Sequence, residues 1–408
     1  MLVTSAVQQR SPVRPNEAAL PTPFAPWPRF DAEDISAVAA VLESGRVNYW
    51  TGEEGRRFEK EFAEAVGCRH GVALANGSVA LEAALRATGI CPGDDVVVTS
   101  RSFVASASSA VIVGARPVFA DVDHVSQNLT AATIEKALTR KARAVIVVHL
   151  AGWPCDMDAI MELAAARGLA VIEDCAQVHG AAYRGRAVGS LGHVAAWSFC
   201  QDKIMTTGGE GGMVTTNNPG IWEKVWSYKD HGKNYDAVYR RAHPPGYRWL
   251  HDSFGTNWRM TELQAALGRV MLRKLPRWVE RRRCHAAALS EAFRELPALR
   301  VTAPPAEVKH VYYKYYVFVR PERLRVGWSR DRIMAAVNAE GVPCFSGYGE
   351  MYLEGAFNSP GLRPERPLPV ARELAESGLQ FLVHPTLTEA DIAATARAVR
   401  KVLRDATA

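Results

Sequence analysis

The chain has 408 residues, of which 48% are hydrophobic, so it is long enough for two or three domains with sizeable buried cores. A formal net charge of only +6, spread along the sequence, disfavours a nucleic-acid-binding protein, and seven cysteines without a CxxC pair disfavour a disulfide framework or a zinc site. Because no apolar run is long enough to span a bilayer and no secretion signal begins the chain, we expect a cytoplasmic protein without a membrane partner.

Residues 1–29 predict an extended N-terminal arm that packs on the protein surface or on a neighbouring subunit. Each proline removes a backbone donor and disfavours a helix, and this segment has six, at positions 12, 15, 21, 23, 26 and 28. The pattern changes at Asp31. An acidic first turn, apolar residues at helical spacing and a glycine at position 45 predict the first helix of the globular part.

A large domain is predicted for residues 30–270, with strands and helices in alternation. Its early strands are continuously apolar, which is typical of parallel strands covered by helices on both faces. The fold class is therefore α/β, with a mostly parallel central sheet. The predicted strands are 71–76, 94–100, 116–123, 142–150 and 169–175, and the predicted helices between them are 78–89, 130–139 and 157–168.

A smaller α+β domain is predicted for residues 271–408. A long helical pattern at 263–297, interrupted at Pro276, leads into it. An aromatic strand follows at 311–321 and a helix at 329–341. The last predicted helix, 389–406, begins after Thr388, which we interpret as its N-cap.

Polar segments follow four of the predicted strands, at the end where parallel sheets bind ligands. These segments are 76–78, 99–103, 149–152 and 174–177. Since the carboxyl ends of parallel strands meet at one edge of the sheet, we expect the four segments to converge on one pocket.

The most specific chemical signal comes from Lys203 and Asp174. A lysine in a glycine-rich turn can form a Schiff base with a carbonyl group. An aspartate at the end of an apolar strand can hold a ring nitrogen protonated, so that the ring accepts electrons. Ser198, and the helix N-terminus at Ser78, suit a phosphate group. Together these parts predict a site for pyridoxal 5′-phosphate.

Four segments of the chain resemble the DegT/StrS-type sugar aminotransferases of fold type I: NGSVAL (76–81), VIEDCAQVHGA (171–181), SFCQDKIMTTGGEGGMVTT (198–216) and FGTNWRMTELQAALG (254–268). The resemblance extends over roughly residues 24–400. It implies that Lys203 is the Schiff-base lysine and that Asp174 is the partner of the pyridine nitrogen. Further cofactor contacts implied by it are Gly77, Ser78 and Ser198 at the phosphate, Phe103 stacked on the ring, Gln177 near the ring hydroxyl, and Asn257 at the phosphate of a neighbouring subunit's cofactor.

The resemblance therefore implies a homodimer with shared active sites and a transaminase dependent on pyridoxal phosphate. The expected reaction moves an amino group from L-glutamate or glutamine to a nucleotide-linked keto sugar, in the biosynthesis of cell-surface polysaccharide or of secondary-metabolite sugars. Pyridoxamine phosphate would be the aminated form of the cofactor.

Three alternatives remain open. The same chemistry could act on a keto-cyclitol or an aminoshikimate-type ketone. A sugar dehydratase dependent on pyridoxamine phosphate is disfavoured, because that branch replaces the lysine with histidine and this chain has Lys203. A non-catalytic regulator that binds pyridoxal phosphate would have a degraded site or an appended DNA-binding domain, and the sequence shows neither.

Polar residues beside these motifs are candidates for substrate contact. His149 and His179 are interpreted as structural, or at most as lining of the pocket, and no spacing of ligands indicates a metal. Alternation along the aromatic strand places about half of its tyrosines in the core. The candidate substrate contacts are Glu210, Lys229, His231, Arg259, Tyr313 and Lys314.

Overall fold

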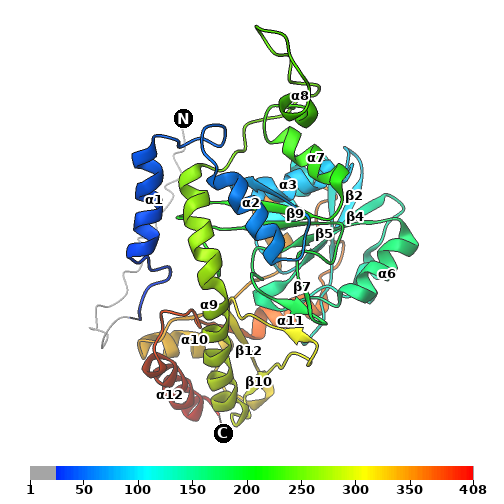
Figure 1. Ribbon diagram of the computed structural model, residues 1–408. Helices are drawn as coiled ribbons and strands as arrows, with labels where there is room; N and C mark the ends of the chain where they lie inside the picture. Colours follow the sequence, from blue (N-terminus) through cyan, green and yellow to red (C-terminus); the bar gives the residue numbers. More distant parts are fainter. Residues whose placement is uncertain (1–23, 408) are drawn as a thin grey trace, which may run out of the picture.

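Two packed parts, each with its own main β-sheet, make up the computed structural model, which describes residues 24–407 (Figure 1). The larger part has a seven-stranded sheet in the order β1–β9–β8–β5–β4–β2–β3, in which only β9 runs antiparallel to its neighbours. The predicted α/β class with a mostly parallel sheet is confirmed. The prediction for residues 1–23 lies outside the described residues. The strands are β1 (His70–Leu74), β2 (Asp95–Thr99), β3 (Arg116–Ala120), β4 (Ala142–Val148), β5 (Ala170–Asp174), β8 (Val194–Ser198) and β9 (Gly212–Thr216).

Helices cover both faces of this sheet, as the continuously apolar strands require. One face packs against α2 (Glu54–Ala65), α5 (Ala131–Ala137), α6 (Met157–Arg167) and the first half of α9 (Glu262–Arg294). The other face packs against α3 (Gly77–Ala87), α4 (Ala105–Ile112) and α7 (Pro219–Tyr228). Helix α4 was not predicted, because it is short and rich in serine and has no side-chain cap at its start.

Helix α9 joins the two parts. Its first half packs against α2 and against α1 (Ala32–Ser44), and its later part packs against β10 and α12 of the smaller part. The predicted interruption at Pro276 is wrong, because the helix continues through this proline. Pro276 has no backbone N–H and so leaves one helical hydrogen bond unmade. The buried side chains of Leu275 and Val279, on either side of it, hold the helix in place. The predicted domain boundary at 270/271 therefore lies inside a helix that both parts share.

The smaller part contains a four-stranded antiparallel sheet in the order β10–β12–β14–β13. The last helix begins as predicted, because the hydroxyl of Thr388 accepts a hydrogen bond from the N–H of Asp391 at 3.2 Å. The elements of this part are β10 (Leu299–Val301), β12 (Tyr315–Val319), β13 (Cys344–Phe345), β14 (Gly378–Phe381), α10 (Arg330–Ala339), α11 (Pro369–Ser377) and α12 (Glu389–Ala406). A separate three-stranded sheet pairs β11 (Val308–Lys309), β6 (Ala182–Tyr183) and β7 (Arg186–Ala187).

The aromatic strand is shorter than predicted. Strand β12 begins only at Tyr315, because the backbone leaves the extended region at Tyr312, where φ is 48°. This turn brings residues 312–314 to the larger part, next to the loop that follows β8.

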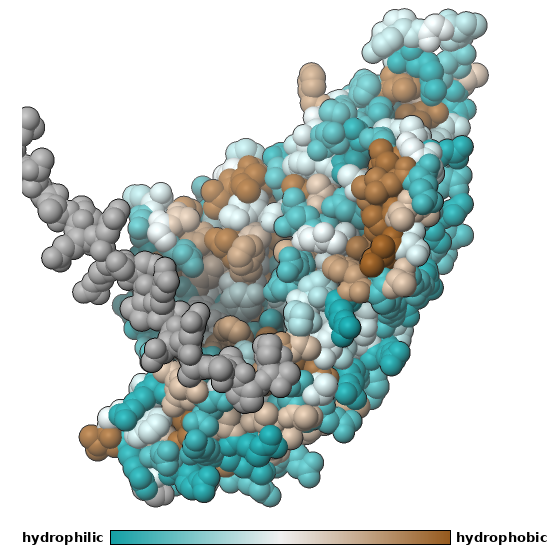
Figure 2. All heavy atoms as spheres, turned by 90° about the vertical axis from the view of Figure 1, so that its left-hand side faces the viewer, coloured by the Kyte–Doolittle hydropathy of each residue, from teal (hydrophilic) through white to brown (hydrophobic). Residues whose placement is uncertain are grey.

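Apolar side chains gather in several patches on the face that carries α1 (Figure 2). On α1 itself, Ile35 is 64% exposed and Leu42 is 59% exposed. A long loop between α8 (Tyr235–Tyr239) and α9 extends away from the rest of the molecule (Figure 1). On that loop Trp249 is 75% exposed and Phe254 is 99% exposed. Among residues 24–407, no helix combines the length and the low polarity that crossing a membrane requires.

Candidate active site

Asp174 lies at the carboxyl end of β5 and is buried. The hydroxyl of Ser106, on α4, donates a hydrogen bond to its Oδ2 at 2.7 Å, and the N–H of Ala176 donates to its Oδ1 at 3.2 Å. Burial raises the pKa of Asp174, and the hydrogen bond from Ser106 and the nearby charge of Lys203 offset this only in part. The carboxyl group is thus fixed in place and desolvated, so a protonated ring nitrogen would complement it.

Lys203 lies in the loop between β8 and β9, in a turn in which its N–H donates to the carbonyl of Cys200. Its Nζ is 3.8 Å from Oδ1 of Asp202 and 5.1 Å from the ring centre of Tyr313. The hydroxyl of Tyr313 donates to the other oxygen of Asp202. The lysine side chain is mostly buried, so both neighbours restrict where its amine can lie. Sequence reasoning missed Asp202, although it is adjacent to Lys203.

Backbone N–H groups and a side-chain hydroxyl form a cradle where α3 begins. Asn76 caps this helix, because its side chain accepts from the N–H of Val79 at 3.1 Å, and Gly77 and Ser78 form the first turn. A Cβ atom on Gly77 would lie only 2.5 Å from Cβ of Ser198, so only glycine permits this approach. The unpaired N–H groups of the first turn and the hydroxyl of Ser198 therefore come together, an arrangement that suits an anion.

Gln177 is held from two sides. Its Oε1 accepts from the N–H of Ala151 at 2.8 Å, and its Nε2 donates to the hydroxyl of Tyr348 at 3.2 Å. Tyr348 comes from the smaller part, and its place in the site could not be found from a local sequence pattern. Phe103 lies on the loop after β2 and is 59% exposed, so its stacking role stays a prediction.

Two of the candidate substrate contacts lie beside Lys203. Tyr313 is buried next to the lysine, and Nζ of Lys314 lies 5.0 Å from the ring centre of Tyr313. Burial lowers the pKa of Lys314, and the charges of Arg282 and Lys203 lower it further, against the effect of Asp202. The smaller part thus adds to the site a second amine, whose charged form is disfavoured by burial.

Lys229 is fully buried, which corrects its prediction as a substrate contact. Its Nζ donates to Oε1 of Glu59 at 2.8 Å and lies 3.9 Å from the ring centre of Tyr49. Glu59 also accepts from the N–H of Ala73 at 2.9 Å. The lysine thus compensates a buried carboxylate in the core.

The remaining candidates stay predictions. Arg259 donates to Oδ1 of Asp230 at 2.8 Å, and His231 and Asn257 are exposed on the segment between α7 and α9. His231 has a φ of 61°, which is uncommon for a residue other than glycine. The side chain of Glu210 is exposed, while its carbonyl accepts from Gln264 of α9 at 2.9 Å.

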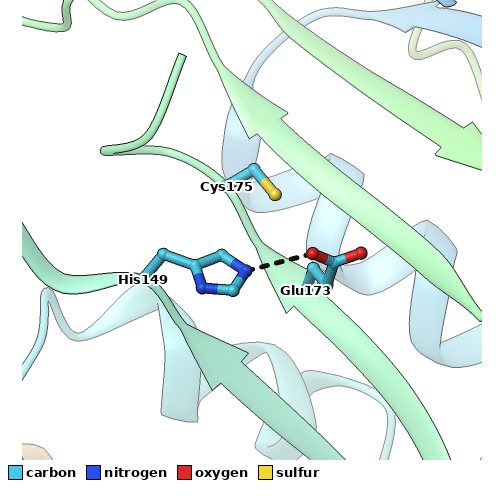
Figure 3. Close-up of side chains that lie close together, drawn as sticks. All are labelled: His149, Glu173 and Cys175. Carbon is cyan, nitrogen blue, oxygen red and sulfur yellow. Dashed lines mark hydrogen bonds and ion pairs between the residues drawn. The ribbon is translucent and has the colours of Figure 1, made fainter. Parts of the chain in front are cut away.

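His149, Glu173 and Cys175 come close enough together to be considered as a metal site (Figure 3). Nδ1 of His149 accepts from the N–H of Cys155 at 3.0 Å, so its Nε2 carries the proton and donates to Glu173 at 3.1 Å. Burial raises the pKa of the Cys175 thiol well above its usual range, which disfavours the thiolate that a metal needs.

Glu173 also accepts three backbone N–H groups, from Gly189, Leu191 and Gly192, at 2.7–3.0 Å. Its oxygens are therefore already occupied. The group is a buried hydrogen-bond network that ties β5 to the segment before β8, in agreement with the structural interpretation of His149.

His179 is buried against two aromatic rings. The centre of its ring lies 5.4 Å from that of Trp197 and 5.6 Å from that of Phe199. Burial lowers the pKa of His179 to about 3, so it is uncharged at neutral pH. These contacts support a packing role for this residue.

Residues 28–400 match the DegT/DnrJ/EryC1/StrS aminotransferase family. The chain belongs to this family. It is accordingly an aminotransferase of fold type I, and its cofactor is pyridoxal phosphate. The cradle at Gly77 and Ser198 and the desolvated carboxyl of Asp174 fit the phosphate and the ring nitrogen of this cofactor.

Three relatives illustrate the similarity. An aminotransferase structure from Psychrobacter cryohalolentis is 55% identical, with a TM-score of 0.92 over 94% of this chain and 99% of that chain. The dTDP-3-amino-3,4,6-trideoxy-alpha-D-glucose transaminase of Streptomyces venezuelae is 36% identical over 91% of this chain and 92% of its own. A protein of Geobacillus stearothermophilus named as a pleiotropic regulatory protein is also 36% identical, over 88% of this chain and 91% of its own.

Proposed function

We propose that this aminotransferase moves an amino group from glutamate or glutamine to the ketone of a nucleotide-linked sugar, in the biosynthesis of polysaccharide or secondary-metabolite sugars. The observation that carries the proposal is the buried Asp174 at the carboxyl end of β5, with the charge of Lys203 acting on it. The similar Streptomyces venezuelae transaminase, whose name includes a dTDP-linked amino sugar, supports the acceptor class.

Each cofactor-binding residue has a proposed role. Pyridoxal phosphate, when bound, supplies a carbonyl carbon for the amine and a ring that accepts electrons. Asp174 would keep the ring nitrogen protonated, and Gln177 would contact the ring hydroxyl. The phosphate would lie against Gly77, Ser78 and Ser198, where the helix N-terminus of α3 and a hydroxyl meet.

Lys203 would act as the base. Its Nζ lies beside the ring of Tyr313 and the carboxylate of Asp202, which limits the positions of the amine. From there its amine can take a proton from the carbon that bears the donor's amino group. In the second half of the reaction it can deliver a proton to the carbon of the acceptor that receives the amino group. Acid–base help of this kind contributes about 10²- to 10⁴-fold in rate.

We further propose a homodimer in the cytoplasm, with Asn257 reaching the phosphate site of the neighbouring subunit. Asn257 is exposed in the single chain and follows the extended loop on which Trp249 and Phe254 are exposed. Exposed aromatic side chains of this kind, together with the apolar patches on the face that carries α1, favour contact with a second copy (Figure 2).

A donor and acceptor screen tests the function. Purified protein is incubated with glutamate or glutamine and a panel of nucleotide-linked keto sugars and keto-cyclitols, and release of the 2-oxo acid is followed. We expect turnover with a nucleotide-linked sugar and none with the Lys203→Ala variant. Turnover with cyclitol ketones alone would overturn the acceptor class. An absence of turnover from a cofactor-loaded protein would favour the regulator.

A further inference from the structure

Residues 24–30, called the N-terminal segment, contact the catalytic loop, which is the loop between β8 and β9 that carries Lys203. The contact is made by Trp27. The indole Nε1 of Trp27 donates a hydrogen bond to the backbone carbonyl of Lys203 at 2.8 Å. The two residues are 176 positions apart in the chain. The backbone of Lys203 is therefore held by the N-terminal segment, which is not part of the seven-stranded sheet.

Trp27 is itself held by residues of α9 and of the smaller part. Its ring meets Trp278 edge-on, with ring centres 5.1 Å apart, and stacks at 6.3 Å on His384. The hydroxyl of Thr386 donates to the carbonyl of Pro26 at 2.9 Å. Pro26 and one face of the Trp27 ring therefore both contact the smaller part, through Thr386 and His384.

Arg282 closes this group of contacts. It is buried on α9, and its guanidinium lies 5.3 Å from the ring centre of Trp27. Its Nη1 also donates to the carbonyl of Tyr313 at 3.2 Å. Tyr313 is the residue whose ring lies beside Nζ of Lys203. The lysine is therefore restrained at its carbonyl by Trp27 and near its amine by Tyr313, and Arg282 contacts both.

This arrangement matters because a lysine side chain has four rotatable bonds and loses precision when its backbone moves. A displacement of about 1 Å at a reacting group can lower a rate by about 10²-fold. We propose that Trp27 is a positioning residue for Lys203, and that the N-terminal segment couples the catalytic loop to the smaller domain through it. The inference rests on the proposed role of Lys203.

The first test measures the loop without cofactor or turnover. Trp27→Phe keeps an aromatic ring and removes the indole N–H, and Trp278→Phe is the matched control in the same cluster. Hydrogen exchange of the peptide covering residues 199–207 is measured in cofactor-free protein. We expect exchange about fivefold faster in Trp27→Phe, as for the loss of one hydrogen bond, and a change below about twofold in Trp278→Phe.

The second measurement uses the cofactor-loaded enzyme. Trp27→Phe should lower kcat about fivefold or more and leave KM for the acceptor unchanged. It should also shift the pH at which the visible absorbance of the bound cofactor is half changed. Equal loop exchange and an equal pH midpoint in Trp27→Phe and Trp278→Phe would overturn the inference. The exchange result stands even if the proposed acceptor is wrong, so the two failures can be told apart.

A milder variant guards against misfolding. Thr386→Val removes only the hydrogen bond to Pro26 and leaves the indole in the chain. It should accelerate loop exchange in the same direction, by about twofold. If Trp27→Phe does not fold and Thr386→Val leaves the exchange of residues 199–207 unchanged, the coupling is disproved.

Discussion

Asp174 is a residue whose surroundings oppose the charge that its function needs. It is buried at the end of β5, and its pKa is raised because desolvation outweighs the hydrogen bond from Ser106 and the charge of Lys203. In the cofactor-free protein, an ionised Asp174 therefore lowers the free energy of unfolding at neutral pH. Active sites commonly hold such groups at the expense of stability.

Asp174→Asn should separate these two effects. The amide keeps the shape and an acceptor for Ser106 but removes the charge, so we expect cofactor-free protein to unfold at a higher temperature at pH 8. The gain should fade at acidic pH, where the wild-type carboxyl is protonated. Transamination should fall by about 10²- to 10³-fold. Thermal melts at both pH values and single-turnover rates are the measurements, and an unchanged rate would contradict the role of Asp174.

Lys229 shows how a polar residue in a sequence motif can belong to the core. Its fully buried ammonium compensates Glu59, whose side chain is 11% exposed, and the ring of Tyr49 lies close to Nζ. Lys229→Met should lower the free energy of unfolding by about 3–5 kcal/mol, because a buried carboxylate is left without its cation.

Chemical denaturation measures this loss, and Lys60→Met on α2 is the control. Lys60 is exposed, at 4.0 Å from Glu64, so its removal should change stability by less than about 0.5 kcal/mol. The acceptor KM of the folded Lys229→Met enzyme should stay the same. A large rise in KM without loss of stability would restore Lys229 as a substrate contact.

At the scale of elements, Glu173 ties strand β5 to the segment that leads into β8. Burial raises its pKa, but the hydrogen bond from His149 and the N–H groups of Gly192 and Gly189 lower it more, so its pKa is lowered overall. The stabilisation is therefore fully present above the unfolded pKa, near 4.5, and is lost as the pH falls through the folded value.

Glu173→Gln should therefore destabilise the protein in a pH-dependent way. At pH 7 we expect a loss of about 3–5 kcal/mol, since a buried, fully bonded carboxylate is replaced by an amide that cannot accept all its donors. Urea unfolding at pH 7 and near pH 4 measures the difference from wild type, which should shrink at the lower pH. A difference that grows on acidification would show that Glu173 is protonated in the native state.

The chain order of elements was predictable where the pattern was local and periodic. The apolar strands before Asp174 and the capped helix after Thr388 follow from residues next to each other in the chain. The unbroken course of helix α9 was not predictable, because packing against both parts of the molecule overrides the local effect of Pro276. Strand β12 starts late for a similar reason, since the turn at Tyr312 follows Val311, whose N–H donates to the carbonyl of Gly152 in the larger part at 3.0 Å.

At the scale of the whole molecule, the site is assembled from three regions. The sheet supplies Asp174 and the lysine loop, the smaller part supplies Tyr348 and Tyr313, and the N-terminal segment supplies Trp27. Only the first of these carries a sequence motif. Tyr313 was a candidate substrate contact from the sequence, but Tyr348 and Trp27 could not be placed, because a contact such as that of Trp27 with Lys203, across 176 positions, leaves no periodic or local signal.

Covalent trapping of the cofactor shows whether Lys203 is the lysine that binds it. Protein loaded with pyridoxal phosphate is reduced with borohydride, digested and mapped by mass spectrometry, beside a Lys203→Ala variant. We expect a stable cofactor adduct on Lys203 in the wild-type chain and none at any lysine in the variant, which should still fold. An adduct on another lysine, or equal labelling of the variant, would contradict this expectation.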